Sequence, residues 1–112
     1  MEIEERRDGS IVILRPVGRI DNSSAVPLQA RLFAAVERNA KGCILDLSAV
    51  PYIASFGMRA IIATARLAAG RRLVVAAPSP VVSDVFKVAH LAQVVPIFDT
   101  VAAAEAALAT PP

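Results

Sequence analysis

Apolar and polar residues follow two alternating spacings along this chain, one typical of strands and the other of helices. Short apolar runs at residues 11–17, 43–47, 73–77 and 94–98 are bounded by glycine, proline or polar residues, which indicates strands. Between them, apolar residues recur every three or four positions, which indicates amphipathic helices. Strands that alternate with helices predict an α/β fold with a largely parallel sheet.

The N-terminal segment predicts a β-hairpin. Asp8-Gly9 is a strong two-residue turn signal between MEIEERR and the apolar run 11–17. Because that run is apolar at successive positions, it should lie inside the sheet. The run 94–98 contains Pro96, which cannot donate a ladder hydrogen bond, and it should therefore lie at an edge. We expect a small mixed sheet, with the hairpin joined to parallel strands.

About four helices are predicted, and three of them have ordinary start signals. Polar residues 21–24 precede the first helix, in which Pro27 fits only the first turn. Ser79-Pro80 reads as the cap and first residue of the third helix. Asp99-Thr100 caps a last, alanine-rich helix that should end at about Ala109.

The second helix and the turn after the third helix carry two further predictions. We expect the second helix to run from a surface-accessible Ser55, as its N-cap, to about Ala69, with Gly70 as the C-terminal cap. His90 should have a positive φ, because the chain must stop and reverse before Leu91. Histidine is one of the few residues other than glycine that visits the left-handed region at tolerable cost.

Length and composition limit the class of protein. The 112 residues suffice for one core, and we expect residues 1–112 to form a single domain. Hydrophobic residues make up 55% of the chain, but no run of about 20 apolar residues occurs that would span a membrane. The charged N-terminus lacks the apolar segment of a signal peptide, and the single Cys43 cannot form an intrachain disulfide. These features favour a cytoplasmic protein.

The distribution of charge argues against a nucleic-acid partner. The net charge is only +2, the 12 Lys and Arg residues are scattered, and aromatic residues make up 4% of the chain. A nucleic-acid surface needs basic side chains clustered on one face, usually with aromatic side chains on which bases stack. We therefore interpret the arginines as solvated surface residues.

Few residues are suited to catalysis or metal binding. His90 is the only histidine, Cys43 is the only cysteine, and no glycine-rich phosphate-binding motif occurs. Cys43 opens a buried strand, which favours a small core residue over a nucleophile. Asp21 and Asp46 are either paired carboxylates or a helix cap and a strand-end residue that bonds the next turn. We expect no enzyme activity, no metal and no cofactor.

Ser55 has two interpretations. As a helix cap, its hydroxyl would accept a hydrogen bond from the N–H of Gly57 or Met58, worth about 1 kcal/mol. As a modification site, it would place a phosphate against free N–H groups and the positive end of the helix dipole. Arg59, one turn along, could pair with that phosphate. In this second interpretation, Gly57 leaves room for a partner to approach closely.

Three segments occur in a characteristic order over nearly the whole chain. EERRDGSIVILRPVGRIDNSSAVPLQARL looks like an opening hairpin, a G-x-[IL]-D turn and a first helix. CILDLSAVPYIASFGMRAII looks like a strand followed by a D-S-S/T-G-L or S-S-A-G-L signature. VFKVAHLAQVVPIFDTVAAAEAAL looks like a helix, a G-L-x-x-V-x-P-[IV]-[FY]-D segment and a closing helix. Together they resemble the STAS family of bacterial anti-sigma factor antagonists, which implies a small sheet with helices.

The resemblance implies a function that depends on Ser55. In the family, the matching serine is phosphorylated by a partner anti-sigma serine kinase, which releases the domain, and a phosphatase restores binding. Asp21 matches the acidic residue beside that serine, so we expect Asp21 to end a strand next to the Ser55 loop. The expected partner-binding residues are Asp21, Ile53, Ser55, Phe56, Gly57, Met58 and Arg59.

Three residues depart from the family pattern. Ala54 stands where an acidic or hydroxylated residue precedes the serine, so a polar contact for a kinase is absent. Phe56 replaces a small residue and adds bulk at the docking face, and His90 stands where glycine is frequent. The acceptor hydroxyl of Ser55 is kept.

Two alternatives to a phosphorylation switch stand beside this interpretation. The first is an unswitched STAS scaffold, such as the cytoplasmic subunit of a lipid-transport complex or a stressosome component. The second is a small flavodoxin-like enzyme or nucleotide-binding protein, against which the lack of a phosphate-binding loop argues.

Overall fold

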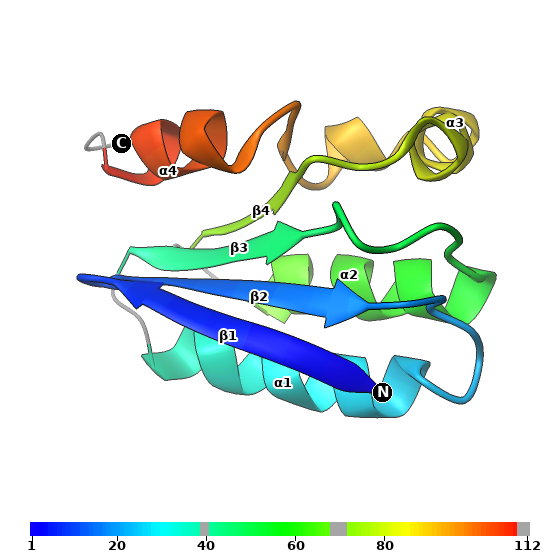
Figure 1. Ribbon diagram of the computed structural model, residues 1–112, viewed down its shortest axis with the longest axis horizontal. Coiled ribbons are helices and arrows are strands. Elements are labelled where there is room, and N and C mark those ends of the chain that lie inside the picture. The colour runs from blue at the N-terminus through cyan, green and yellow to red at the C-terminus, as the bar shows by residue number, and fades with distance from the viewer. Residues whose placement is uncertain (39–40, 68–71, 110–112) are drawn as a thin grey trace.

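The computed structural model describes residues 1–38, 41–67 and 72–109, which form a five-stranded mixed sheet with four helices (Figure 1). This confirms the predicted α/β class. The predicted end of the second helix, at Ala69 and Gly70, lies outside the described residues. The elements are β1 Glu2–Asp8, β2 Ile11–Val17, α1 Ala25–Arg38, β3 Gly42–Asp46, α2 Ser55–Leu67, β4 Leu73–Ala76, α3 Pro80–Val88, the 3₁₀ turn η1 Leu91–Gln93, β5 Ile97–Phe98 and α4 Val101–Ala109.

The strands lie in the order β1-β2-β3-β4-β5. Strands β1 and β2 pair antiparallel as the predicted hairpin, and every later pairing is parallel. As predicted, the apolar β2 lies inside the sheet and β5 lies at an edge, although β5 comprises only Ile97–Phe98 and not the whole predicted run 94–98. The hairpin turn is one residue later than predicted. Asp8 still pairs with Ile11, so Gly9 and Ser10 form the turn, and Gly9 has the positive φ of +60° that such a turn requires.

Side chains of the sheet alternate between two cores. Val12 and Leu14 of β2 belong to a core shared with α1, α2 and α3. Ile11 and Ile13 belong to a smaller core, which Ala104 and Leu108 of α4 complete. Figure 1 shows α1 and α4 on opposite sides of the sheet. This alternation follows from the two-residue period of a strand, and it explains why β2 is apolar at successive positions.

Local capping signals were confirmed where the cap uses a nearby hydroxyl. The N–H of Val82 donates to Oγ of Ser79 at 3.3 Å, and the N–H of Ala103 donates to Oγ1 of Thr100 at 3.1 Å. His90 follows α3 with φ 54° and ψ 38°, which confirms its predicted left-handed conformation. The caps therefore start α3 and α4 where the sequence indicates, and His90 ends the helical path of α3.

A short parallel contact beyond the strands positions the region of Ser55. Ile20 and Ile53 form an isolated β-bridge. The N–H of Ile20 donates to the carbonyl of Tyr52 at 2.9 Å, and the N–H of Ala54 donates to the carbonyl of Ile20 at 2.8 Å. The segment after β2 therefore lies directly beside the segment that leads into α2.

Candidate functional site

Ser55 is exposed at the start of α2, as predicted, but it is the first helical residue rather than the N-cap. The first bond of the helix runs from the N–H of Met58 to the carbonyl of Ala54 at 3.1 Å, so Ala54 occupies the N-cap position. The predicted cap was one residue late because Ile20 holds the N–H of Ala54, a contact between segments far apart in sequence.

The hydroxyl of Ser55 is therefore not used to cap the helix. Within the described ranges, Oγ of Ser55 has no hydrogen-bond partner in the protein, and the expected donor Met58 bonds Ala54 instead. The N–H groups of Ser55, Phe56 and Gly57 have no acceptor within the helix, because they precede its first bond. A phosphate attached to this exposed hydroxyl would lie beside free N–H groups, at the positive end of the helix dipole.

Asp21 lies next to this helix start, as expected, although it follows an isolated bridge residue rather than a full strand. Its Oδ1 accepts hydrogen bonds from the hydroxyl of Ser23 at 2.7 Å, the hydroxyl of Ser24 at 2.8 Å and the N–H of Ser24 at 3.1 Å. These hydrogen bonds, led by that from the Ser23 hydroxyl, lower the pKa of Asp21 to about 2. Asp21 is therefore a fixed negative charge beside the Ser55 region.

Asp21 and Asp46 each contact residues near them and do not contact each other, so they do not form a pair of catalytic carboxylates. Oδ1 of Asp46 accepts from the N–H of Ser48 at 3.0 Å, as expected for a strand-end residue. Oδ2 of Asp46 lies 3.8 Å from Nε of Arg15. Cys43 is buried, and burial raises the pKa of its thiol to about 12, in agreement with the predicted core role. In the described part of the chain, no group of three or more metal-ligating side chains occurs.

Gly57 has a different role from the one predicted. A Cβ at this position would lie 2.6 Å from Cγ2 of Ile20 and 2.9 Å from Cγ1 of Ile53. The glycine therefore lets the chain's own isoleucines pack against α2, and the space beside it is filled. Gly57 is buried and Ile53 is only 2% exposed, so both support the surface from beneath and contribute little to its outer face.

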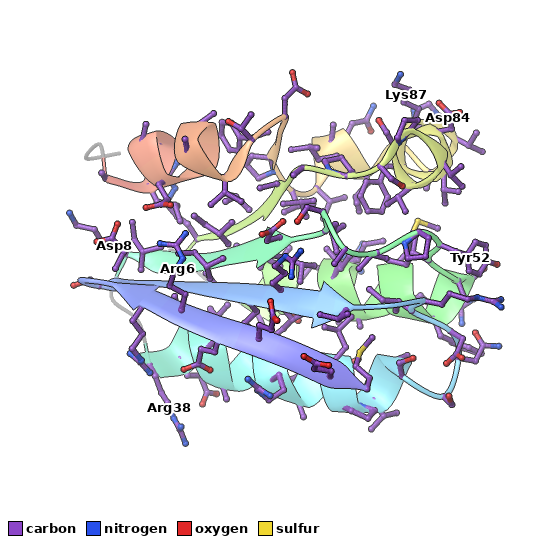
Figure 2. The ribbon with its side chains drawn as sticks, viewed as in Figure 1. Arg6, Asp8, Arg38, Tyr52, Asp84 and Lys87 are labelled. Carbon is purple, nitrogen blue, oxygen red and sulfur yellow. The ribbon has the colours of Figure 1, made fainter. Side chains whose placement is uncertain are left out.

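Two arginine–aromatic pairs flank Ser55. The guanidinium carbon of Arg59 lies 5.2 Å from the ring centroid of Phe56, and that of Arg19 lies 5.3 Å from the ring centroid of Tyr52. Both aromatic residues are exposed, Phe56 by 47% and Tyr52 by 41%. Arginine and exposed aromatic side chains are the residue types that contribute most at protein–protein interfaces. Figure 2 shows Tyr52 at the opposite end of the molecule from Arg6 and Asp8.

The structure adds residues that the sequence did not predict. Arg19 and Tyr52 are brought beside the predicted residues because Ile20 pairs with Ile53, and that pairing leaves no signal in either segment alone. The partly buried Met58 packs against the larger core, so it presents less surface than predicted. The Ser55 surface, as we use the term below, consists of Arg19, Asp21, Tyr52, Ser55, Phe56 and Arg59.

The described helices include none that is long and apolar enough to cross a membrane.

Comparison with known proteins supports the fold and the family. A protein of Bordetella bronchiseptica named as a candidate anti-sigma factor antagonist, BtrV, is 31% identical over 96 residues, which cover 83% of this chain and 82% of that protein.

Two solved structures share the fold. A candidate anti-sigma factor antagonist from Thermotoga maritima has a TM-score of 0.88 at 22% identity, covering 96% of this chain and 95% of that one. The Bacillus cell fate determinant SpoIIAA in its phosphorylated form has a TM-score of 0.65 at 18% identity, covering 86% and 90%. The model of the STAS domain matches residues 2–104. The chain therefore belongs to the STAS domain family.

Proposed function

We propose that this STAS domain is a non-enzymatic anti-sigma factor antagonist of the cytoplasm. It binds a partner anti-sigma serine kinase through the Ser55 surface, and phosphorylation of Ser55 releases the partner. The observation that carries the proposal is the Ser55 hydroxyl, which is exposed and not used as a cap at the start of α2. The name of the Bordetella relative, and the phosphorylated form in which SpoIIAA was solved, support it.

The unmodified surface is suited to a protein partner. Phe56 and Tyr52 offer apolar area, and Arg59 and Arg19 lie over their rings. An arginine stacked on an aromatic ring is already partly ordered, so less side-chain entropy is lost when a partner covers the pair. In this proposal, Asp21 sets the charge at one side of the contact, and Ile53 and Gly57 hold the helix start in place.

A phosphate on Ser55 would change the partner contact more than the fold. Within the chain, the free N–H groups and Arg59 would stabilise the added charge by about 1 kcal/mol. A partner packed against Phe56 would have to desolvate a doubly charged group, which costs several kcal/mol. The expected result is a loss of affinity of about a hundredfold or more. A phosphatase would restore the binding form.

The test uses an anti-sigma serine kinase from the same organism, chosen from the genes next to that of this protein. The purified chain is incubated with the kinase and ATP, the phosphate is mapped, and kinase binding is compared for the unmodified, phosphorylated and Ser55→Ala forms. Ser79→Ala is the matched control, because Ser79 also starts a helix but its hydroxyl caps that helix. Phosphate on Ser55 with weakened binding supports the proposal, and phosphate on another residue contradicts it.

An unswitched scaffold is the second candidate, and Phe56 favours it. The side chain of Phe56 is large and exposed next to the acceptor hydroxyl, and Arg59 lies over its ring. Ala54 offers a kinase no polar side chain. A scaffold subunit would bind its partner with equal affinity whether Ser55 is unmodified or phosphorylated. That result would favour a lipid-transport or stressosome subunit over the switch.

A further inference from the structure

A groove that shares no residue with the Ser55 surface lies where α3 meets η1 and β5. Its volume is about 400 Å³, which is within the range of roughly 300–1,000 Å³ found for small-molecule sites. Phe86 and Ile97 provide its apolar part: Phe86 is 2% exposed and belongs to the main core, and Ile97 is half-buried on the edge strand. The apolar wall is therefore held by the core and by the sheet.

The polar part of the groove offers hydrogen-bond donors and no negative charge. Ser83, Lys87, His90 and Gln93 line it, and its lining contains no carboxylate. Ser83 and Lys87 are four residues apart on α3 and so share one side of that helix. Figure 2 shows Lys87 and Asp84 on the outer side of α3. Lys87 forms no ion pair with Asp84 or with any other described residue. The ammonium group is thus available to a ligand.

Three main-chain carbonyls in the turn after α3 accept hydrogen bonds within that turn. The carbonyl of Lys87 accepts from the N–H of His90 at 3.2 Å, and the carbonyl of His90 accepts from the N–H of Gln93 at 3.1 Å. The carbonyl of Leu91 accepts from two further N–H groups, at 2.9 and 3.0 Å. These three acceptors are thus occupied, and the charge that the side chains of the lining offer to a ligand is that of Lys87, which is positive.

His90 occupies a position at which glycine would have less backbone strain. Its φ of 54° lies in the left-handed region, in which any side chain is disfavoured relative to glycine. Non-glycine residues in such conformations cluster at binding sites, where a specific side chain outweighs the strain. Here the side chain lines the groove, within the same turn as Lys87.

We propose that this groove binds a small amphipathic anion. The apolar body of the ligand packs on Phe86 and Ile97, and its carboxylate or phosphate is held by Lys87 and His90, with the amide of Gln93 as a further donor. A charged donor beside an apolar wall favours such a ligand over a neutral one of the same length.

The experiment titrates the full chain with octanoate, phenyl phosphate and the uncharged octanamide, and follows the backbone amide signals by NMR. The expected result is a saturable shift confined to residues 83–97 for at least one anion, with octanamide at least about tenfold weaker. The anion that binds more tightly is the one used to compare the substitutions below. Equal affinity for octanamide and octanoate, shifts spread over the whole chain, or no saturable shift with either anion would overturn the proposal.

Two substitutions and a control separate binding from stability. Lys87→Gln and His90→Gly should each weaken binding of the preferred anion by about tenfold, whereas Lys41→Gln, at the chain's other lysine, should not change it. His90→Gly should keep or raise Tm, because it relieves the positive φ. If Lys87 serves only to complement the helix end, Lys87→Gln will lower Tm and leave the affinity unchanged, and the proposal fails.

Discussion

The starts of α2 and α3 both contain a serine, but the two hydroxyls are used differently. Oγ of Ser79 precedes α3 and accepts from the N–H of Val82 at 3.3 Å. Ser55 lies one residue further in, with Ala54 at the N-cap position, and its hydroxyl faces solvent. A shift of one residue therefore separates a serine that stabilises its helix from one that is available to another protein.

The third helical residue shows a second difference. In α3 it is Val82, which is fully buried, and in α2 it is Gly57, which is buried without a side chain. Ile20 and Ile53 lie so near Gly57 that no Cβ fits there without movement. The start of α2 is thus pressed against the neighbouring segment, whereas the start of α3 packs through an ordinary core side chain.

The largest expected effect concerns the free hydroxyl of α2. Phosphoserine at position 55, introduced during synthesis, should weaken binding of the kinase by about a hundredfold or more, because the interface would have to desolvate the phosphate. Phosphoserine at position 79 should leave that binding unchanged, since Ser79 lies outside the Ser55 surface. Calorimetric titration of both forms provides the measurement, and equal affinities for the two would remove the distinction between the serines.

Gly57→Ala should destabilise the fold by about 1–3 kcal/mol, although alanine is ordinarily the better helix former. The added Cβ would contact Ile20 and Ile53 at distances that require one of them to move. Urea unfolding of the two proteins measures the difference in the free energy of unfolding. A stabilised Gly57→Ala protein would show that the start of α2 is less tightly packed than described.

The two serines should differ in their effect on stability. Ser79→Ala should lower the free energy of unfolding by about 1 kcal/mol through loss of the cap, whereas Ser55→Ala should change it by less than about 0.5 kcal/mol. Thermal unfolding of both variants at one pH tests the contrast. A loss for Ser55→Ala as large as that for Ser79→Ala would mean that Ser55 acts as a cap after all.

The smallest expected effect is the pH dependence that Asp21 adds. Because hydrogen bonds from Ser23 and Ser24 lower its folded pKa to about 2, its contribution to stability is present above the ordinary carboxyl pKa and is lost as the pH falls towards 2. The difference in stability between the parent and Asp21→Asn should therefore shrink between about pH 4 and pH 2. A difference that stays constant across this interval would indicate that the carboxylate is not held by these hydroxyls.

The sequence predicted those features that depend on neighbouring residues. The hairpin, the buried strands, the caps at Ser79 and Thr100 and the left-handed His90 all follow from local patterns. It placed the hairpin turn and the cap of α2 one residue off, because the pairing of Asp8 with Ile11 and the bond from Ala54 to Ile20 decide them. The exact ends of helices and strands depend on contacts with other segments, and the local sequence pattern does not reveal those contacts.

The Ser55 surface combines residues that the sequence proposed with two that only the structure brings beside them. Ser55, Asp21, Phe56 and Arg59 were identified from capping chemistry and family resemblance. Arg19 and Tyr52 were not proposed from the sequence, because they come together only through the bridge between Ile20 and Ile53. Gly57 was assigned a role toward a partner, since glycine in a sequence does not reveal which atoms approach it.

The bridge between Ile20 and Ile53 has a consequence for the kinetics of recognition. Its two hydrogen bonds tie together two loops that would otherwise sample many arrangements in the free protein. A surface ordered before encounter loses little conformational entropy on docking, so association need not wait for a rearrangement. The amide protons of Ile20 and Ala54 should accordingly exchange with solvent as slowly as those of a strand, although both residues lie outside the named strands and helices.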